Sequence, residues 1–188
     1  MFEKSSTVLV VALEDELPKV MLPGWRICYT GVGKINATFY LFQEIMKYKP
    51  ETIVNFGTAG SLRQDLSGLQ EVSIFKQRDM DASGLSFPIG ETPFDTIDTI
   101  DNARNGLSCG TGDSFVKDSP KLLTDLVDME AYAHAKVCKL LGINFFCFKY
   151  ISDEANQNAE LDWNSNLKRG SESFVERFTA LNGCKEFS

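Results

Sequence analysis

The chain has 188 residues, enough for one α/β domain with a sizeable core, and 43% of them are hydrophobic, including 14 Phe. Its 19 basic and 26 acidic residues give a net charge of −7, and no Lys- or Arg-rich run could follow a phosphate backbone. Composition therefore argues against nucleic acid and anionic membranes as partners.

The cysteine pattern and the N-terminus indicate the cellular setting. Five cysteines are scattered without any C-x-x-C pair, which is typical of reduced, buried thiols in a cytoplasmic protein. Residues 1–17 contain an apolar core of only about seven residues that stops at three acids, too short for a transmembrane helix. We expect this segment to be a first strand.

The first half of the chain alternates predicted strands with one helix. Residues 7–13 form a continuous β-branched and apolar run, which predicts a strand at the centre of a parallel sheet. Three acids follow at residues 14–16, either as a solvated turn or with one acid pointing into a ligand crevice. Residues 25–30 form a second short strand, and a helix begins near Lys34 and cannot continue past Pro50.

Residues 52–56 predict the next strand, followed by the small residues Gly57-Thr58-Ala59-Gly60. This segment is either a tight turn or a place where backbone N–H groups approach a ligand closely. Residues 71–75 form another strand, and residues 79–105 are polar and aperiodic, which predicts a long loop. Residues 107–109 predict a short strand before a second glycine-rich turn at 110–114.

Residues 127–156 predict a strand end, a helix, a strand and a polar loop. Ala131, Ala135 and Cys138 fall at helical spacing, and Gly142 is suited to a helix C-cap. Glu130 is therefore expected in the first helical turn. We interpret His134 as a helix-surface histidine, because no partner stands at metal-ligand spacing, and no metal site is expected.

Residues 143–151 have the apolar composition of a strand buried on both faces, and Asp153 follows directly. Open α/β sheets bind ligands outside the carboxyl ends of their strands. Asp153 is thus either a loop cap or a working acid. A terminal helix follows with Phe174, Phe178 and Leu181 on its apolar face, and residues 1–188 are expected to form a single domain.

Several motifs together resemble the nucleoside phosphorylase superfamily, most closely its 5′-methylthioadenosine/S-adenosylhomocysteine nucleosidase branch. They occur in the family's order across nearly the whole chain: ALEDE (12–16), TGVGKINA (30–37), VNFGTAGSL (54–62), GTGDSF (110–115), VDMEAYAHA (127–135) and ISDEAN (151–156). The resemblance implies a three-layer α/β/α sandwich around a twisted mixed sheet. It also implies a cytoplasmic homodimer that acts in methionine salvage and cleaves the N-ribosidic bond of purine nucleosides without a cofactor.

The resemblance also assigns roles to individual residues. Asp153 would protonate purine N7, Glu16 would activate the attacking water, and Glu130 would hold the ribose hydroxyls. Ribosidic cleavage passes through an oxocarbenium-like cation, so acids in these three places suit the chemistry independently of the family. The remaining substrate-binding positions carried over from the family are Thr58 near the water, Phe115 and Val116 on the purine, Met129 on the sugar, Ser152 beside the acid and Trp163 over the 5′ substituent.

Lys149 departs from the family pattern, which usually has an Arg four residues before the catalytic Asp. It keeps a cation but loses the planar fork. On a strand whose other residues look buried, this Lys needs a carboxylate partner, and we expect its ammonium to lie near Glu16 or Glu130 as part of the substrate site.

Hydrolysis is favoured over phosphorolysis because the first loop, ALEDELP, has no Arg, whereas phosphorylases hold phosphate with arginines there. Arg78 is a cation that could still contribute to binding a phosphate. Two alternatives stay open: a phosphate-dependent purine nucleoside phosphorylase, and a nucleoside-binding protein that keeps the fold without turnover.

Overall fold

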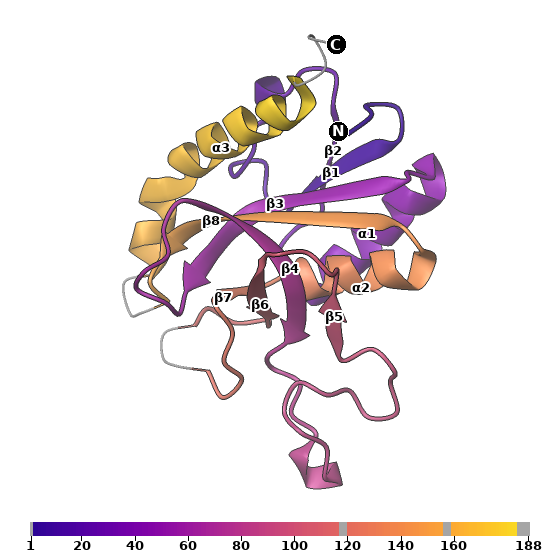
Figure 1. The fold of residues 1–188 in the computed structure, drawn as a ribbon, viewed down its shortest axis with the longest axis vertical. Helices are drawn as coiled ribbons and strands as arrows, with labels where there is room; N and C mark the ends of the chain where they lie inside the picture. Colours follow the sequence, from indigo (N-terminus) through magenta and orange to yellow (C-terminus); the bar gives the residue numbers. More distant parts are fainter. Residues whose placement is uncertain (1, 117–119, 156–158, 184–188) are drawn as a thin grey trace.

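A mixed sheet forms the centre of the computed structural model, which describes residues 2–116, 120–155 and 159–183 (Figure 1). The described residues form an eight-stranded sheet. Its strands are β1 (Thr7–Val11), β2 (Arg26–Tyr29), β3 (Thr52–Ser61), β4 (Leu69–Gln77), β5 (Thr99–Asp101), β6 (Leu107–Thr111), β7 (Leu126–Asp128) and β8 (Asn144–Asp153). The helices are α1 (Lys34–Tyr48), α2 (Ala131–Leu141) and α3 (Ala159–Gly183), with short 3-10 turns η1 (Lys19–Met21) and η2 (Ser83–Leu85).

Part of the sheet closes on itself. The strand order is β2-β1-β3-β7-β6-β4-β5, and β8 pairs with both β3 and β4. The pairings β3–β7–β6–β4–β8 and back to β3 therefore complete a ring. Strand β1 lies between β2 and β3, parallel to both and fully buried, which confirms the predicted central parallel strand.

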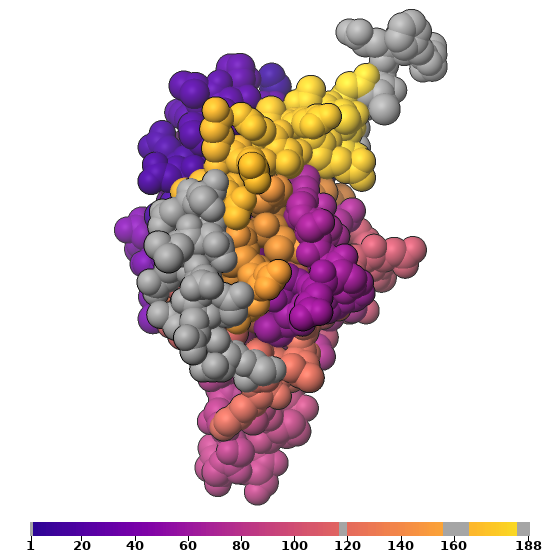
Figure 2. Space-filling model, turned by 90° about the vertical axis from the view of Figure 1, so that its left-hand side faces the viewer, coloured from indigo at the N-terminus to yellow at the C-terminus, as the bar shows by residue number. Residues whose placement is uncertain are grey.

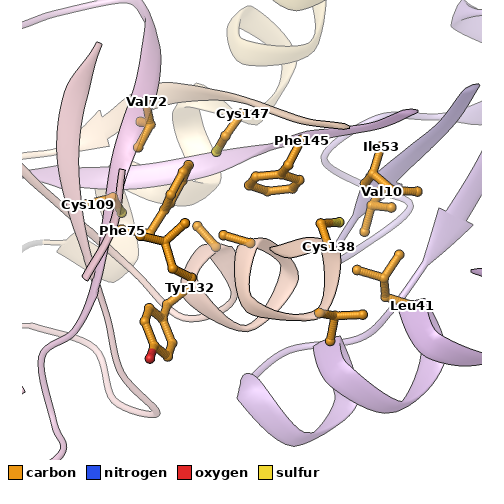
Figure 3. Close-up of a cluster of buried hydrophobic side chains, with 14 of the residues drawn as sticks. Val10, Leu41, Ile53, Val72, Phe75, Cys109, Tyr132, Cys138, Phe145 and Cys147 are labelled. Carbon is orange, nitrogen blue, oxygen red and sulfur yellow. The ribbon is translucent and has the colours of Figure 1, made fainter. Parts of the chain in front are cut away.

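Helices cover both faces of the sheet, so the predicted three-layer α/β/α fold is confirmed. Figure 1 shows α1 and α2 on one side and α3 on the other. The first core packs between the sheet and α1 and α2; it includes Leu41, Phe75, Cys138 and Phe145 (Figure 3). The second core lies under α3, where Phe174 stacks on Phe56 with ring centroids 4.4 Å apart. Burying apolar side chains on both faces is what stabilises a sheet of this kind.

Strand β3 is longer than the sequence predicts. The segment from Gly57 to Gly60 is the second half of this strand and is paired to β8, not a turn beyond a strand that ends at Phe56. Glycine has low strand propensity, but pairing with a neighbour overrides that preference here. The helix ends agree with prediction: Gly142 caps α2 in the left-handed conformation with φ of 68°, and α1 stops just before Pro50.

The long segment between β4 and β5 projects from one end of the molecule, as Figures 1 and 2 show. It contains η2, and its last part forms the edge strand β5 against β4, which the sequence did not predict. Its side chains Leu85 and Phe94 are exposed. In the part of the chain that the structure describes, no helix is both long and apolar enough to cross a membrane.

Candidate active site

A pocket lies where several strands reach their carboxyl ends. It encloses about 690 Å³ of empty space, open mouth included. The walls come from the loop after β1, the second half of β3, the ends of β7 and β8, and the segment after β6. The lining residues are Ala12, Leu13, Glu16, Val32, Thr58, Ala59, Gly60, Arg78, Ser114, Phe115, Val116, Val127, Asp128, Met129, Glu130, Ser152 and Asp153.

Glu16 is held in the pocket wall by hydrogen bonds from β3 and from its own loop. Its Oε1 accepts from the backbone N–H of Thr58 at 2.9 Å and from the Thr58 hydroxyl at 2.8 Å, and its Oε2 accepts from Leu13 N–H at 3.2 Å. The side chain is buried. Of the three acids at residues 14–16, Glu16 is thus the one that points into the crevice, and Thr58 fixes its orientation.

Glu130 is the N-cap residue of α2 and lies one position before the predicted first turn. Its Oε1 accepts a hydrogen bond from the backbone N–H of Gly33 at 2.9 Å. This bond ties the start of α2 to the loop before α1. Burial, followed by the neighbouring Asp128 carboxylate, raises the pKa of Glu130 to about 8, whereas Lys149 acts in the opposite direction. Near neutral pH this side chain is therefore largely protonated in the free protein.

Asp153 is the last residue of β8, which extends two residues beyond the predicted strand end at residue 151. Its place at the carboxyl end of a buried strand is as predicted. Its Oδ2 accepts from the Ser152 hydroxyl at 2.8 Å, and its Oδ1 accepts from Ala155 N–H at 2.8 Å. The β3–β8 register shifts between Ala59 and Gly60, which brings Gly60 opposite Asp153. A Cβ on Gly60 would lie 2.7 Å from Asp153 Oδ1, so only glycine leaves room for the carboxylate. The bulge thus aims Asp153 into the pocket.

Lys149 forms an ion pair with Asp128, not with the acids expected from the sequence. Its Nζ lies 2.8 Å from Asp128 Oδ2, and the Lys149 side chain is only 2% exposed. The ion-pair partner is thus Asp128, but the ammonium still lies near Glu130, because its positive charge opposes the rise in the pKa of that carboxyl group. A Cβ built on Gly57 would lie 3.1 Å from Lys149 Nζ and 3.6 Å from Glu16 Oε1, so the ammonium does lie on the Glu16 side of the site. Lys149 is nevertheless absent from the lining residues.

Asp128 is the connecting residue of this buried network. Besides Lys149, it accepts from the Thr111 hydroxyl at 2.6 Å and from the N–H of Ala131, at the start of α2, at 2.8 Å. Burial alone would lower the pKa of Lys149 and raise that of Asp128, but their attraction outweighs burial. The net shift is upward for Lys149 and downward for Asp128, so both stay charged.

The other predicted binding residues fall into two groups. Thr58, Met129 and Ser152, together with Phe115 and Val116 after β6, line the same pocket as the three acids. Phe115 is 44% exposed. Trp163 belongs to α3, but its side chain lies outside the described residues. The functional roles assigned to all these positions stay predictions.

His134 is not a surface residue, contrary to the interpretation from sequence. Its side chain is fully buried on α2, and neither ring nitrogen has a hydrogen-bond partner among the described residues. Burial, reinforced by the nearby positive charge of Lys149, lowers the pKa of His134 to about 3. The ring is therefore neutral across the physiological range.

Sequence reasoning missed two residues of the site. Asp128 was passed over in favour of Glu130 two positions later, although the need of Lys149 for a buried partner pointed to another acid at a strand end. Arg78 was noted only as a possible phosphate contact, yet it lines the pocket and binds the segment before Phe115. Among the residues that the structure describes, no cluster of three or more His, Cys, Asp or Glu could hold a metal ion.

Three comparisons with known proteins bear on this arrangement. Residues 108–182 match the family model of the Phosphorylase superfamily. A 5′-methylthioadenosine/S-adenosylhomocysteine nucleosidase from an Exiguobacterium species is 29% identical over 173 residues, which cover 77% of this chain and 74% of the relative.

Two solved structures from Helicobacter pylori share the fold at low sequence identity. The futalosine hydrolase is 19% identical, with a TM-score of 0.85 over 94% of this chain and 97% of the other. A mutant of the methylthioadenosine nucleosidase with 5′-methylthioadenosine in its active site is 19% identical, with a TM-score of 0.84 over 97% and 99% of the two chains. The family-model match and the nucleosidase relative confirm the resemblance inferred from the motifs, to the nucleoside phosphorylase superfamily and to its nucleosidase branch.

Proposed function

We propose that this chain is a purine nucleosidase that hydrolyses the N-ribosidic bond of 5′-methylthioadenosine- or S-adenosylhomocysteine-type nucleosides. One observation carries the proposal: Glu16, Glu130 and Asp153 come from three separate strand ends, are all buried, and line one pocket. The nucleosidase relatives described above support the choice of reaction.

Each acid has a proposed role, and its hydrogen bonds fix its orientation. Glu16 keeps both oxygens in use as acceptors from Thr58 and Leu13, which orients the carboxylate to take a proton from the attacking water. Glu130, protonated near neutral pH, both donates to and accepts from ribose hydroxyls. Asp153 is oriented by Ser152, and in its carboxylic acid form it transfers its proton to the leaving base and becomes a carboxylate.

The buried pair beneath the pocket supports this arrangement electrostatically. Cleavage develops positive charge on the sugar, and a carboxylate fixed in a low-dielectric site, as Glu16 is, stabilises it without reorganisation. Lys149 neutralises Asp128, so the two together add little net charge. The three lining acids are therefore left to act on the substrate.

Water is the nucleophile in this proposal. Arg78 is the only Lys or Arg among the described residues that line the pocket, and its Nη2 donates to the backbone carbonyls of Gly112 and Ser114. A site with acids at the nucleophile position repels phosphate.

The decisive experiment incubates purified protein with 5′-methylthioadenosine, S-adenosylhomocysteine, adenosine and inosine, with and without phosphate. Free base is measured together with the sugar product. We expect adenine release in phosphate-free buffer. Strict dependence on phosphate, with a ribose 1-phosphate product, would replace the hydrolase by a phosphorylase. Binding without turnover of any nucleoside would favour the non-catalytic alternative.

We also propose a homodimer formed through α1 and α2. Ile35, Phe39, Phe42 and Met46 are 45–81% exposed and recur at spacings of three or four along α1, which makes one apolar stripe. Three of them, Ile35, Phe39 and Phe42, line a surface groove together with Leu140 of α2. A contiguous apolar surface of this kind on a single chain is typical of an interface.

Light scattering after gel filtration tests the dimer. We expect the wild-type protein at twice the chain mass and the Phe39→Glu variant at the mass of one chain. Val20, also exposed but on η1, provides the control, because Val20→Glu should stay dimeric. A wild-type monomer at micromolar concentration would refute the homodimer.

A cytoplasmic role in methionine salvage completes the proposal. The four described cysteines are free thiols, and Cys109, Cys138 and Cys147 are buried, which suits a reducing compartment. Cell fractionation tests the location. The role in salvage predicts that cells without the gene accumulate methylthioadenosine.

A further inference from the structure

Arg78 holds the backbone of the segment that leads into Phe115. It follows β4 directly, and its backbone N–H donates to the Thr111 carbonyl at 2.9 Å, so the backbone of Arg78 extends the β4–β6 ladder. At the other end, Nη2 donates to the carbonyl of Gly112 at 3.1 Å and to that of Ser114. One guanidinium thus spans both carbonyls of a short turn.

Gly112 is shaped to accept this guanidinium. A Cβ on Gly112 would lie 2.8 Å from Arg78 Cζ and 2.9 Å from its Nη1, so the planar group packs directly against the glycine backbone. The contact therefore requires both a flat cation at position 78 and the absence of a side chain at position 112. The strand pairing of the sheet by itself demands neither an arginine at position 78 nor a glycine at position 112.

We propose that Arg78 is a positioning residue that sets the wall of the pocket against which the purine base lies, an inference that rests on the proposed function. Phe115 and Val116, the proposed base contacts, follow Ser114 without an intervening residue. Fixing the carbonyls of Gly112 and Ser114 therefore fixes where these two residues enter the pocket. Arg78 itself lines the pocket beside them.

The position of Arg78 predicts an effect on binding rather than on the chemical step. Its bonds go to the segment that carries Phe115, whereas Asp153 and Glu16 are oriented by Ser152, Ala155, Thr58 and Leu13. Loosening the segment should therefore weaken capture of the base while the acids stay in place. The expected signature is a higher KM and weaker adenine binding with kcat nearly unchanged.

Two different substitutions probe the same contact. Arg78→Gln removes the guanidinium, and Gly112→Ala keeps the arginine but displaces it by a collision with Cζ. Loss of two charge-assisted hydrogen bonds should raise KM for the nucleoside and Kd for adenine about tenfold or more. Arg78→Lys should fall between Arg78→Gln and wild type, because an ammonium reaches a carbonyl but does not pack flat.

Arg104 supplies a matched control. It too is a partly buried arginine that donates to a backbone carbonyl, that of Phe145 at 2.9 Å, and it lies over the Phe146 ring, but it does not line the pocket. Arg104→Gln should leave KM and adenine affinity at the wild-type level. Thermal unfolding of all variants separates lost stability from lost binding.

The outcomes separate this inference from the proposed function. Arg78→Gln and Gly112→Ala with wild-type KM and adenine affinity would overturn the role of Arg78 and leave the nucleosidase intact. An equal rise in KM for Arg104→Gln, or a fall in kcat alone, would also overturn it. A wild-type protein that neither cleaves nucleosides nor binds adenine would overturn the inference together with the proposed function.

Discussion

Replacing His134 should remove an acid-sensitive term from the free energy of unfolding. The chain contains one histidine, and in the folded protein it is fully buried with its pKa lowered to about 3. In the unfolded chain the pKa returns to about 6.5. The unfolded state therefore binds a proton that the folded state refuses, and stability is lost as the pH falls from 6.5 toward 3.

The magnitude follows from these two pKa values. At pH 7.5 the term is negligible, and at pH 5 it amounts to about 2 kcal/mol of lost stability. Glu130 changes stability in the opposite sense, because its pKa of about 8 lets the folded state hold an extra proton between pH 4.5 and pH 8. A comparison of variants at each pH cancels the contribution of Glu130.

The assay is urea denaturation of wild type and His134→Leu at pH 7.5 and pH 5, with tryptophan fluorescence as the signal that monitors unfolding. Leucine keeps a similar volume and removes two ring nitrogens that have no partner among the described residues. Between the two pH values, wild type should lose about 2 kcal/mol more than the variant. Equal losses, or a histidine NMR signal that titrates near pH 6.5 in the folded protein, would refute the reasoning.

Three further predictions concern the site. Asp153→Asn should lower the rate by roughly 10²- to 10⁴-fold with the fold intact, and a near wild-type rate in the base-release assay would reduce Asp153 to a loop cap. Lys149→Met should lower the free energy of unfolding, measured by urea denaturation, by roughly 3–5 kcal/mol, because the buried Asp128 carboxylate loses its ion-pair partner. Adding Asp128→Leu to Lys149→Met should restore much of this stability. An unchanged loss in the double variant would contradict the ion pair. Gly60→Ala should reduce activity at least about tenfold by displacing Asp153, whereas Gly84→Ala, where nothing lies within 4 Å, should not; equal activities would contradict the collision.

Residues governed by local sequence were predictable. Asp153 follows a buried strand and Gly142 follows a helical period, and the structure places both as expected. Glu130 was expected in the first turn of α2 and is the N-cap residue, one position earlier. The assignment of His134 to the helix surface was wrong, although the sequence pattern indicates a buried position. His134 stands three residues after Ala131 and four before Cys138, on the apolar face of α2.

Features set by tertiary pairing were not predictable from one sequence. Lys149 was known to need a carboxylate, but its choice of Asp128 depends on β7 and β8 lying on either side of β3. The segment from Gly57 to Gly60 has turn-like composition, and only its pairing with β8 makes it a strand. Long-range contacts thus overrode local preference in both places.

The closed ring of strands has a consequence for how this protein folds. Its longest ladder joins β3 to β8, starting with Thr52 beside Asn144, so about ninety intervening residues must be gathered before the two strands meet. Thr58 and Gly60 stand on one of these strands, and Ser152 and Asp153 on the other. Because such distant pairings are slow to form, refolding should lag behind that of helical proteins of the same size. Catalytic competence should then appear only at the final step, with no partly active intermediate.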